Sequence, residues 1–202
     1  MNYLKDQQRR TAYDTRNAQI DKDAVSRIIC DRFIAHPAYQ QAETVMWYIH
    51  CRSEVRTVPA LLHELATGKR IVVPYCTKDE QGQNKLGLWR LEDFAELVQG
   101  MWGILEPPRQ RWGEAGKEIA PEQLDLIMVP GVGFDRDGGR LGNGAGYYDR
   151  LLMGVRADAV LSGVCYESQL FEQIAMEPHD VAMDTVMTEK TIYNGKGRKF
   201  SS

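Results

Sequence analysis

Apolar side chains recur along this chain with two periods, one typical of helices and one typical of strands. Residues 17–33 carry them at a near-helical spacing, which predicts an amphipathic helix. The side chains that define this face are Ile20, Ala24, Ile28 and Phe33. A second helix is expected over 57–66, with Gly68 just past its end as a C-cap.

Compact apolar runs predict the strands of a sheet. They cover residues 43–50, 70–76, 124–130 and 159–166. A more exposed strand is expected over 85–91, after a polar turn. Continuous apolar runs are expected where helices cover both faces of a sheet, and strands that alternate with helices favour an α/β fold with a mainly parallel sheet. Ligands of such folds bind beyond the carboxyl ends of the strands.

Composition narrows the class of protein further. The 202 residues, 43% of them hydrophobic, carry a net charge of −3, which gives no electrostatic reason to expect nucleic acid as a partner. No run approaches the length of a membrane span, and the N-terminus has no apolar leader segment, so we expect a cytoplasmic protein. No segment indicates a coiled coil, and a monomer is expected. Residues 191–202 are glycine-containing and locally basic, which predicts a flexible tail.

A glycine-rich segment between Pro130 and Arg150 is the most distinctive feature of the chain. It reads PGVGFDRDGGRLGNGAGYYDR and holds seven of the 18 glycines. An apolar strand precedes it and a possible helix follows, so unpaired backbone N–H groups would meet the positive end of a helix dipole. Arginines add fixed positive charge, and aspartates could hold a divalent metal. The segment therefore predicts phosphate chemistry, with a ligand-free structural turn as the alternative.

The segment differs from two common phosphate-binding motifs. It is not GxxxxGK[ST], and it lacks the early position and the acidic partner of a dinucleotide fingerprint. It closely resembles the signature of the 5-formyltetrahydrofolate cyclo-ligase family. The resemblance continues in order along the chain: Lys5 and Arg9 resemble the family's KxxxR, Glu54 its substrate-contacting glutamate, WGILEP the segment ahead of its central loop and DVAMDTVMTE its closing strand.

The resemblance implies a three-layer α/β/α fold in one domain over residues 1–202. It implies an enzyme that uses ATP and Mg²⁺ to convert 5-formyltetrahydrofolate into 5,10-methenyltetrahydrofolate, with release of ADP and phosphate. Arg140 and Tyr147 would be catalytic, and Asp149 and Asp184 would hold Mg²⁺. The implied ATP-binding residues are Lys5, Arg9, Arg140, Leu141, Gly142, Asn143, Gly144, Ala145, Gly146, Tyr147 and Tyr148. The implied folate-binding residues are Ile49, Glu54, Trp102, Asn143, Gly144, Ala145, Gly146 and Tyr147.

The chain departs from the family pattern at two places. Tyr75 follows the proline of the IVVPYC strand, where many members of the family have a basic residue, so a phosphate contact from this strand is in doubt. Asn143 and Ala145 replace larger or charged residues in the loop, which removes a possible cation but leaves the loop glycines in place.

The residues alone leave several of these roles open. Asp149 is either a metal ligand or a helix-start residue, and Asp184 either holds a metal or pairs with Arg150. Glu54 either fixes a pterin amino group or is solvated, or caps the next helix. Trp102 either stacks on a pteridine or lies half-buried in a loop.

Two pairs of side chains are judged from helical geometry. Lys5 and Arg9 are four residues apart and share one face of an N-terminal helix, which either reaches the nucleotide or is an ordinary solvated face. Tyr147 and Tyr148 would point about 100° apart on a helix. We assign Tyr147 to the ligand side and Tyr148 to the packed side.

Two other functions compete with the cyclo-ligase hypothesis. A phosphosugar isomerase or acyl-transferase of similar architecture would need a glutamate, lysine or cysteine in the site, and the glycine-rich loop has none. A non-catalytic nucleotide- or folate-binding relative would be indicated by loss of Arg140, the loop glycines or Asp149, all of which are present. The ATP-dependent cyclo-ligase is therefore the expected function.

Overall fold

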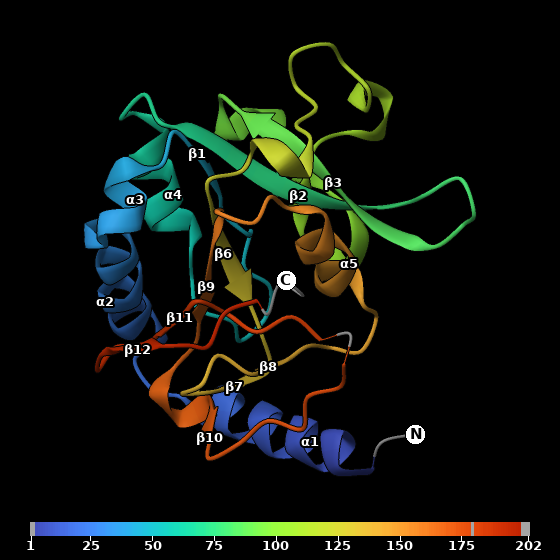
Figure 1. The fold of residues 1–202 in the computed structure, drawn as a ribbon. Coiled ribbons are helices and arrows are strands. Elements are labelled where there is room, and N and C mark those ends of the chain that lie inside the picture. The colour runs from blue at the N-terminus through green and yellow to red at the C-terminus, as the bar shows by residue number, and fades with distance from the viewer. Residues whose placement is uncertain (1–2, 179, 199–202) are drawn as a thin grey trace.

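A seven-stranded sheet forms the centre of the computed structural model, which describes residues 3–178 and 180–198 (Figure 1). Its strands are β1 (Thr44–Met46), β2 (Arg70–Lys78), β3 (Asn84–Leu91), β6 (Leu126–Pro130), β9 (Val160–Val164), β11 (Thr185–Met187) and β12 (Ile192–Asn194). They lie in the order β12-β11-β9-β6-β1-β2-β3. The strands from β11 to β2 are parallel, and the edge strands β3 and β12 are antiparallel to their neighbours. The predicted mainly parallel sheet is confirmed.

Helices and a smaller sheet cover the two faces of this central sheet. One face packs against α2 (Lys22–Ala35), α3 (Pro37–Gln41) and α4 (Val58–Leu65). The other face packs against α5 (Tyr147–Gly154) and a three-stranded sheet of β7 (Gly133–Asp135), β8 (Arg140–Leu141) and β10 (Leu170–Phe171). The fold is therefore the expected three-layer α/β in a single domain, although its third layer is partly β-structure.

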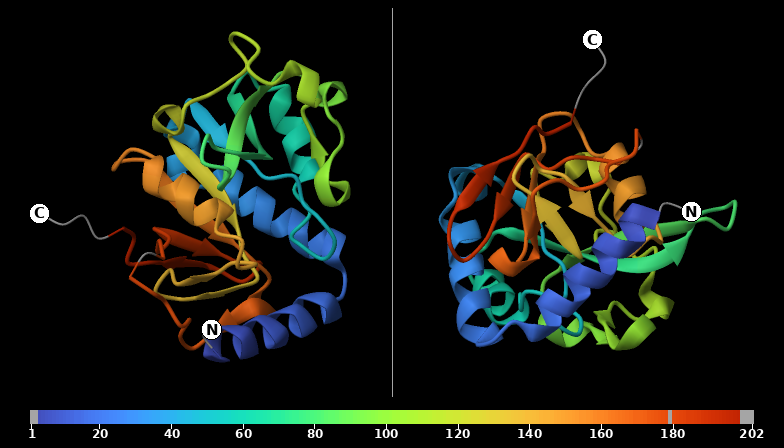
Figure 2. Two further views of the ribbon diagram at one scale, coloured as in Figure 1. Left: turned by 90° about the vertical axis from the view of Figure 1, so that its right-hand side faces the viewer. Right: turned by 90° about the horizontal axis from the view of Figure 1, so that it is seen from below.

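The N-terminal helix α1 (Tyr3–Ala18) lies across the end of the molecule that carries β7, β8 and β10 (Figures 1 and 2). The remaining elements are β4 (Val98–Gln99), β5 (Leu105–Glu106) and the 3-10 helices η1 (Phe94–Glu96), η2 (Met101–Gly103), η3 (Arg109–Arg111), η4 (Pro121–Gln123) and η5 (Glu167–Gln169). Among the described residues, no helix is long and apolar enough to cross a lipid bilayer.

The helix predicted over residues 17–33 is wrong in its start and in its buried face. Helix α1 ends at Ala18, α2 begins at Lys22, and Asp21 between them has a left-handed backbone with φ 49°. Ile20 and Ile28 are exposed, whereas Ile29 and Phe33 are fully buried. The sequence spacing identified Phe33 correctly but otherwise selected solvent-facing residues, because the buried stripe of α2 mixes apolar residues with small polar ones such as Ser26.

Strand β3 is more buried than expected. Leu86, Leu88, Trp89 and Leu91 lie in the core. Helix α5 packs on one face of β3, and Trp89 forms a bridge with Glu118 on the segment that follows, so this segment covers the outer edge of the strand. The polar turn before the strand indicated its start correctly but said nothing of this cover.

The predicted tail over 191–202 is also wrong within its described part. Strand β12 pairs with β11, and the Arg198 guanidinium donates to backbone carbonyls of residues 155–159, including Val155 at 3.2 Å. These contacts fix the chain as far as Arg198. Residues 199–202 lie outside the described residues.

The glycine-rich segment does not pass directly from strand to helix. Between β6 and α5 the chain first forms the β7–β8 hairpin, which is closed by Gly138 at φ 91°. A Cβ at Gly138 would lie 2.3 Å from the Met183 carbonyl oxygen, so the hairpin tip packs against the segment before β11. The expected helix start is confirmed at Tyr147, directly after the loop 142–146.

Candidate functional site

The loop of residues 142–146, called the glycine loop below, ends at the N-terminus of α5. Gly144 and Gly146 have left-handed φ values of 91° and 68°, and Gly146 is the N-cap residue with no side-chain cap. Such backbone strongly favours glycine, and the first turn of α5 therefore presents uncapped N–H groups at the positive end of the helix. Asn143, Gly144 and Ala145 are exposed. This geometry suits an anionic ligand such as phosphate.

Helix α1 contacts the glycine loop from outside. Arg9 Nε donates to the Gly142 carbonyl oxygen at 3.0 Å, and the Tyr13 hydroxyl donates to Asn143 Oδ1. Arg9 is also paired with Asp6 at 2.7 Å on its own helix. Arg9 is thus brought to the glycine loop.

Lys5 is not brought to the glycine loop. Its ammonium lies 2.8 Å from Glu177 and 2.6 Å from Asp180, and its side chain is 9% exposed. Burial acts to lower its pKa, but hydrogen bonds and charge from Asp180 and Glu177 outweigh burial and raise the pKa. The ammonium therefore holds α1 to the segment before β11 in this structure.

Arg140 lies beneath the glycine loop and is almost completely buried. Its Nη2 donates to Asp149 Oδ1 at 2.5 Å and its Nη1 to the Pro130 carbonyl oxygen at 3.4 Å. Its Nε has no hydrogen-bond partner among the described residues. A Cβ at Gly142 would lie 3.0 Å from Nη1, so glycine lets the loop pass directly over the guanidinium. Arg140 therefore links the end of β6, the glycine loop and the first turn of α5.

Glu54 lies on residues 47–57, which follow β1 at the carboxyl end of the sheet and are called the Glu54 segment below. Its Oε2 accepts the Cys51 N–H at 2.9 Å, and its Oε1 lies 3.8 Å from Arg16 Nη1. Burial raises the pKa of Glu54, while the Cys51 hydrogen bond and the positive charges of Arg16 and Arg52 act to lower it. The N-cap of α4 is Thr57, so Glu54 does not cap that helix.

Arg16 and Tyr13 were missed by the sequence reasoning. Arg16 is 3% exposed, donates from Nε to Ser53 Oγ at 3.1 Å, and has no hydrogen-bond partner for Nη1 among the described residues. Tyr13 lies under its guanidinium, 5.1 Å from ring centroid to Cζ. Tyr13 and Arg16 follow Arg9 at i+4 and i+7 of α1. A helical face of polar residues was therefore the sequence pattern that could have identified them. That face connects the glycine loop to the Glu54 segment.

The two tyrosines of α5 both face the site, from different sides. The Tyr147 ring meets Trp102 edge-on, with centroids 6.3 Å apart. The Arg140 guanidinium lies 5.8 Å from the Tyr148 ring centroid. Burial, then the negative charge of Glu54, raise the pKa of Tyr148 well above its ordinary value. Tyr148 is half-buried and packs against the core beside Arg140.

The other residues that the resemblance assigned to ligand binding differ in exposure. Trp102 is 58% exposed, in a left-handed backbone conformation with φ 57°. Ile49 and Leu141 are buried, in the segment after β1 and in β8. The Tyr75 hydroxyl donates to Glu118 Oε1 at 2.7 Å, so its hydrogen-bonding group is satisfied within the protein.

Asp149 and Asp184 are not brought together. Asp184 precedes β11 and accepts the Leu161 N–H at 2.7 Å. Asp149 lies instead near Pro130, because its partner Arg140 contacts the Pro130 carbonyl. Leu161 pairs with Ile127 in the sheet, three residues before Pro130, which is about 10 Å along a strand. The alternative pairing of Asp184 with Arg150 is also wrong, because Arg150 donates to the carbonyls of Asn84 and Ala145.

Comparisons with known proteins agree with this geometry. The sequence model described as the 5-formyltetrahydrofolate cyclo-ligase family matches residues 2–189. A relative named 5-formyltetrahydrofolate cyclo-ligase from Mycolicibacterium smegmatis is 37% identical over 147 residues, which cover 73% of this chain and 74% of the relative. A relative of the same name from Mus musculus is 29% identical over 169 residues, 81% of this chain and 82% of the relative.

Solved structures show the same fold. The NMR structure of Aquifex aeolicus 5,10-methenyltetrahydrofolate synthetase superposes with a TM-score of 0.79 at 31% identity, covering 98% of this chain and 97% of the other. A Mycoplasma pneumoniae 5,10-methenyltetrahydrofolate synthetase is similar in fold, with a TM-score of 0.70 at 24% identity over 94% and 99% of the two chains. With its matching sequence model, glycine loop and sheet, the chain belongs to the 5-formyltetrahydrofolate cyclo-ligase family.

Proposed function

We propose that this protein converts 5-formyltetrahydrofolate into 5,10-methenyltetrahydrofolate at the expense of ATP, with Mg²⁺ and with release of ADP and phosphate. The observation that carries the proposal is the convergence of three segments in a member of the cyclo-ligase family. Helix α1, the glycine loop and the Glu54 segment meet at the carboxyl end of one sheet, through Arg9 on Gly142 and Arg16 on Ser53. Such an edge is where α/β folds bind ligands.

The chemistry asks for positioning and charge neutralisation. The formyl oxygen on N5 is a poor leaving group, so it must be activated before it can depart. The γ-phosphoryl group of ATP passes to that oxygen, ADP leaves, and the carbon becomes an iminium carbon bearing a phosphate ester. N10 then attacks this carbon, loses its proton, and phosphate departs with the former formyl oxygen. These steps need no covalent enzyme intermediate.

The glycine loop supplies the groups that an ATP tail requires. Its uncapped N–H groups at the start of α5 would bind phosphate oxygens, and Arg9 at the loop edge would add a cation. Arg140 acts from beneath, because its guanidinium is buried and already paired with Asp149. We therefore assign Arg140 to fixing the loop and its electrostatic field, in place of an open two-pronged grip on phosphate.

Mg²⁺ fits this site as an ion carried by the nucleotide. Such an ion is typically held by one or two carboxylates together with substrate phosphates and water. Within the described residues no three His, Cys, Asp or Glu side chains gather into a metal site. Asp149 lies beside the glycine loop with its side chain 25% exposed, and it would be the carboxylate ligand. Bound there, the ion would neutralise charge on the phosphates.

The folate would lie against the Glu54 segment. The Glu54 carboxylate would accept hydrogen bonds from the pterin amino group, and Arg16 would keep that carboxylate ionised. Trp102 and Tyr147, which meet edge to face, offer an aromatic wall for the ring system. Ile49 would contact the same ligand from the core side.

The proposal is tested by turnover. Purified protein is mixed with 5-formyltetrahydrofolate, ATP and Mg²⁺, and the near-ultraviolet absorbance of the methenyl product is followed together with ADP. We expect equal amounts of both products and no reaction when ATP or Mg²⁺ is omitted. Absence of both products under these conditions would contradict the proposed function. Light scattering on the same sample tests the further proposal that the enzyme is a monomer.

A further inference from the structure

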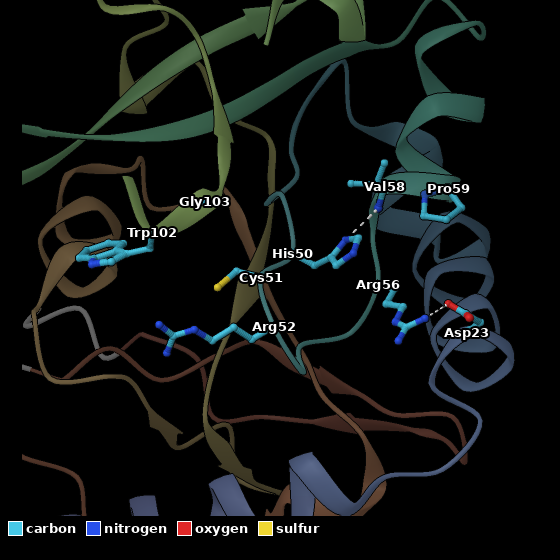
Figure 3. Close-up of a pocket in the computed structure, with 9 residues that line it drawn as sticks. All are labelled: Asp23, His50, Cys51, Arg52, Arg56, Val58, Pro59, Trp102 and Gly103. Atoms are coloured by element: carbon cyan, nitrogen blue, oxygen red, sulfur yellow. Dashed lines mark hydrogen bonds and ion pairs between the residues drawn. The ribbon is translucent and has the colours of Figure 1, made fainter. Parts of the chain in front are cut away.

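A pocket of about 480 Å³ lies next to the Glu54 segment (Figure 3). Its walls include Arg52 and Trp102 on one side, Arg56 with Asp23 on the other, and His50 between them. Cys51, whose N–H binds Glu54, also lines it. The pocket therefore continues from the place where the pterin ring is proposed to bind.

Arg52 is the cation of this pocket that has no direct partner among the described residues, although its charge acts on the nearby Glu54 carboxylate. Its guanidinium forms no hydrogen bond or ion pair with a described residue, and the side chain is exposed. Its backbone is left-handed at φ 54°, as is that of Trp102 on the same side of the pocket at φ 57°. Left-handed backbone in residues other than glycine is strained and concentrates at ligand sites. Two such residues line this one pocket.

The other polar groups of the pocket also favour an anion. His50 Nδ1 accepts the N–H groups of Thr57 and Val58 at 3.1 and 3.4 Å, which places the ring proton on Nε2 as a donor. Burial and the neighbouring Arg56 lower the pKa of His50, so the ring is a neutral donor. The acidic residue of the pocket, Asp23, is already paired with Arg56.

A reduced folate carries its negative charge at the end away from the pterin. That end is a glutamate, with two carboxylates, linked through a flat p-aminobenzoyl ring, and further glutamates add one net negative charge each. We propose that this pocket binds the glutamate tail, with Arg52 holding its carboxylates and His50 donating to additional glutamates. The inference rests on the proposed function, because it takes Glu54 as the pterin-binding end.

Arg52 then acts as a specificity-determining residue. A charge-assisted hydrogen bond from a guanidinium is strong and directional. Because the group is exposed, its attraction to a polyglutamate is screened by salt. Arg52 is proposed to contact the glutamate tail and not the reacting groups. Its loss should therefore change the binding of folate and leave the chemical step unchanged.

The experiment compares three ligands and three proteins. The ligands are 5-formyltetrahydropteroate, which has no glutamate, and the mono- and triglutamate forms of 5-formyltetrahydrofolate. The proteins are the wild type, Arg52→Gln, and Arg70→Gln, which removes an exposed guanidinium from the amino end of β2. Dissociation constants are measured by quenching of tryptophan fluorescence, and KM and kcat by turnover. Arg52→Lys is added to test whether charge alone restores binding.

We expect wild-type affinity to rise from pteroate to monoglutamate to triglutamate. In Arg52→Gln the affinity for the triglutamate falls about tenfold, which corresponds to about 1.4 kcal/mol. Its affinity for the pteroate falls less, because Arg52 reaches the pterin end only through its charge on Glu54. Its KM for ATP and all values in Arg70→Gln stay at the wild-type values. Arg52→Lys recovers part of the loss, and added salt weakens the wild type more than Arg52→Gln.

Two results would overturn the inference. One is equal affinity of the wild type for the three ligands, and the other is an equal loss for pteroate and triglutamate in Arg52→Gln. Failure of the proposed function is a separate outcome. It would show as absence of turnover in the wild type, whereas the fluorescence titrations still decide whether the pocket binds the tail.

Discussion

Arg140 Nη2 and Asp149 Oδ1 lie 2.5 Å apart and join strand β8 to the first turn of α5. The guanidinium side chain is 4% exposed and the carboxylate side chain 25%, so the pair is buried on its arginine side and open on its aspartate side. A helix start is thereby fixed at the point where the glycine loop ends. The proposed metal ligand and the proposed support of the loop are one unit.

Arg140→Ala is expected to impair both folding and catalysis. Removal of the guanidinium leaves Asp149 without its cation and removes the contacts that hold the glycine loop. We expect the free energy of unfolding to fall by about 1–3 kcal/mol. We expect a lower Tm and a kcat reduced about 100-fold, because transition-state charge is stabilised by fixed groups. Thermal unfolding and steady-state kinetics measure the two effects.

Arg140→Lys separates these contributions. Lysine keeps the charge but cannot reach Asp149 and Pro130 together, so we expect most of the stability to return and most of the loss in kcat to persist. Unchanged kinetics in Arg140→Ala would remove Arg140 from the site.

Arg9→Gln is expected to weaken ATP binding. Arg9 lies against the glycine loop through the Gly142 carbonyl, and its charge would face the triphosphate. We expect the KM for ATP to rise about three- to tenfold, the worth of one partly exposed charge-assisted hydrogen bond, with the KM for folate unchanged.

The matched control for this change is Arg10→Gln. Arg10 is the next residue of α1 and is exposed, on a different face of the helix. If both variants raised the KM for ATP equally, the effect would come from the net charge of α1 and not from contact with the loop.

The pH dependence of folate binding should report the ionisation of Glu54. Burial raises the pKa of this carboxyl, and the carboxylate is the form that accepts hydrogen bonds from the pterin. As pH falls through that pKa the carboxylate becomes protonated, so kcat/KM for 5-formyltetrahydrofolate should fall on the acid side. Arg16 lowers the pKa, and Arg16→Gln should therefore move this fall to higher pH.

The measurement is kcat/KM for folate from neutral to mildly acidic pH, with the non-enzymatic rate subtracted. Glu54→Gln is the reference, because it cannot ionise at this position and should lack this acid limb. The same acid limb in Glu54→Gln and in the wild type would show that another group controls it.

Local patterns along the chain predicted the strands better than the helices. Strands β6 and β9 are covered on both faces, so they appear as continuous apolar runs that any window detects. Helix α2 instead contacts the sheet through a stripe that includes Ser26, which bonds to the Tyr166 hydroxyl. A polar residue whose partner lies 140 positions away cannot be recognised as buried from local spacing.

The same limit explains which site residues could be predicted. The glycine loop is determined locally, because Gly144 and Gly146 need left-handed backbone. The fates of Lys5 and Arg16 depend on Asp180 and Ser53, which tertiary structure brings to α1. Both residues are cations on one helix, and local spacing does not distinguish the one that distant carboxylates neutralise from the one that approaches the Glu54 segment.

The glycine at the start of α5 provides the last prediction. Gly146 has φ 68°, and a Cβ there would lie 2.9 Å from Arg150 Nη1, which a flexible side chain can relieve. Gly146→Ala should therefore cost mainly the left-handed strain, about 1–2 kcal/mol.

Gly68 is the matched control, because it has φ 83° with nothing within 4 Å of a Cβ and lies just before the amino end of β2. Both variants should lose similar stability in urea unfolding. Relief of the strain would reorient the N–H groups of the glycine loop in Gly146→Ala alone, so its KM for ATP should rise about tenfold, a loss of about 1.4 kcal/mol, while Gly68→Ala keeps the wild-type value. Equal KM values in the two variants would mean that the start of α5 does not bind the nucleotide.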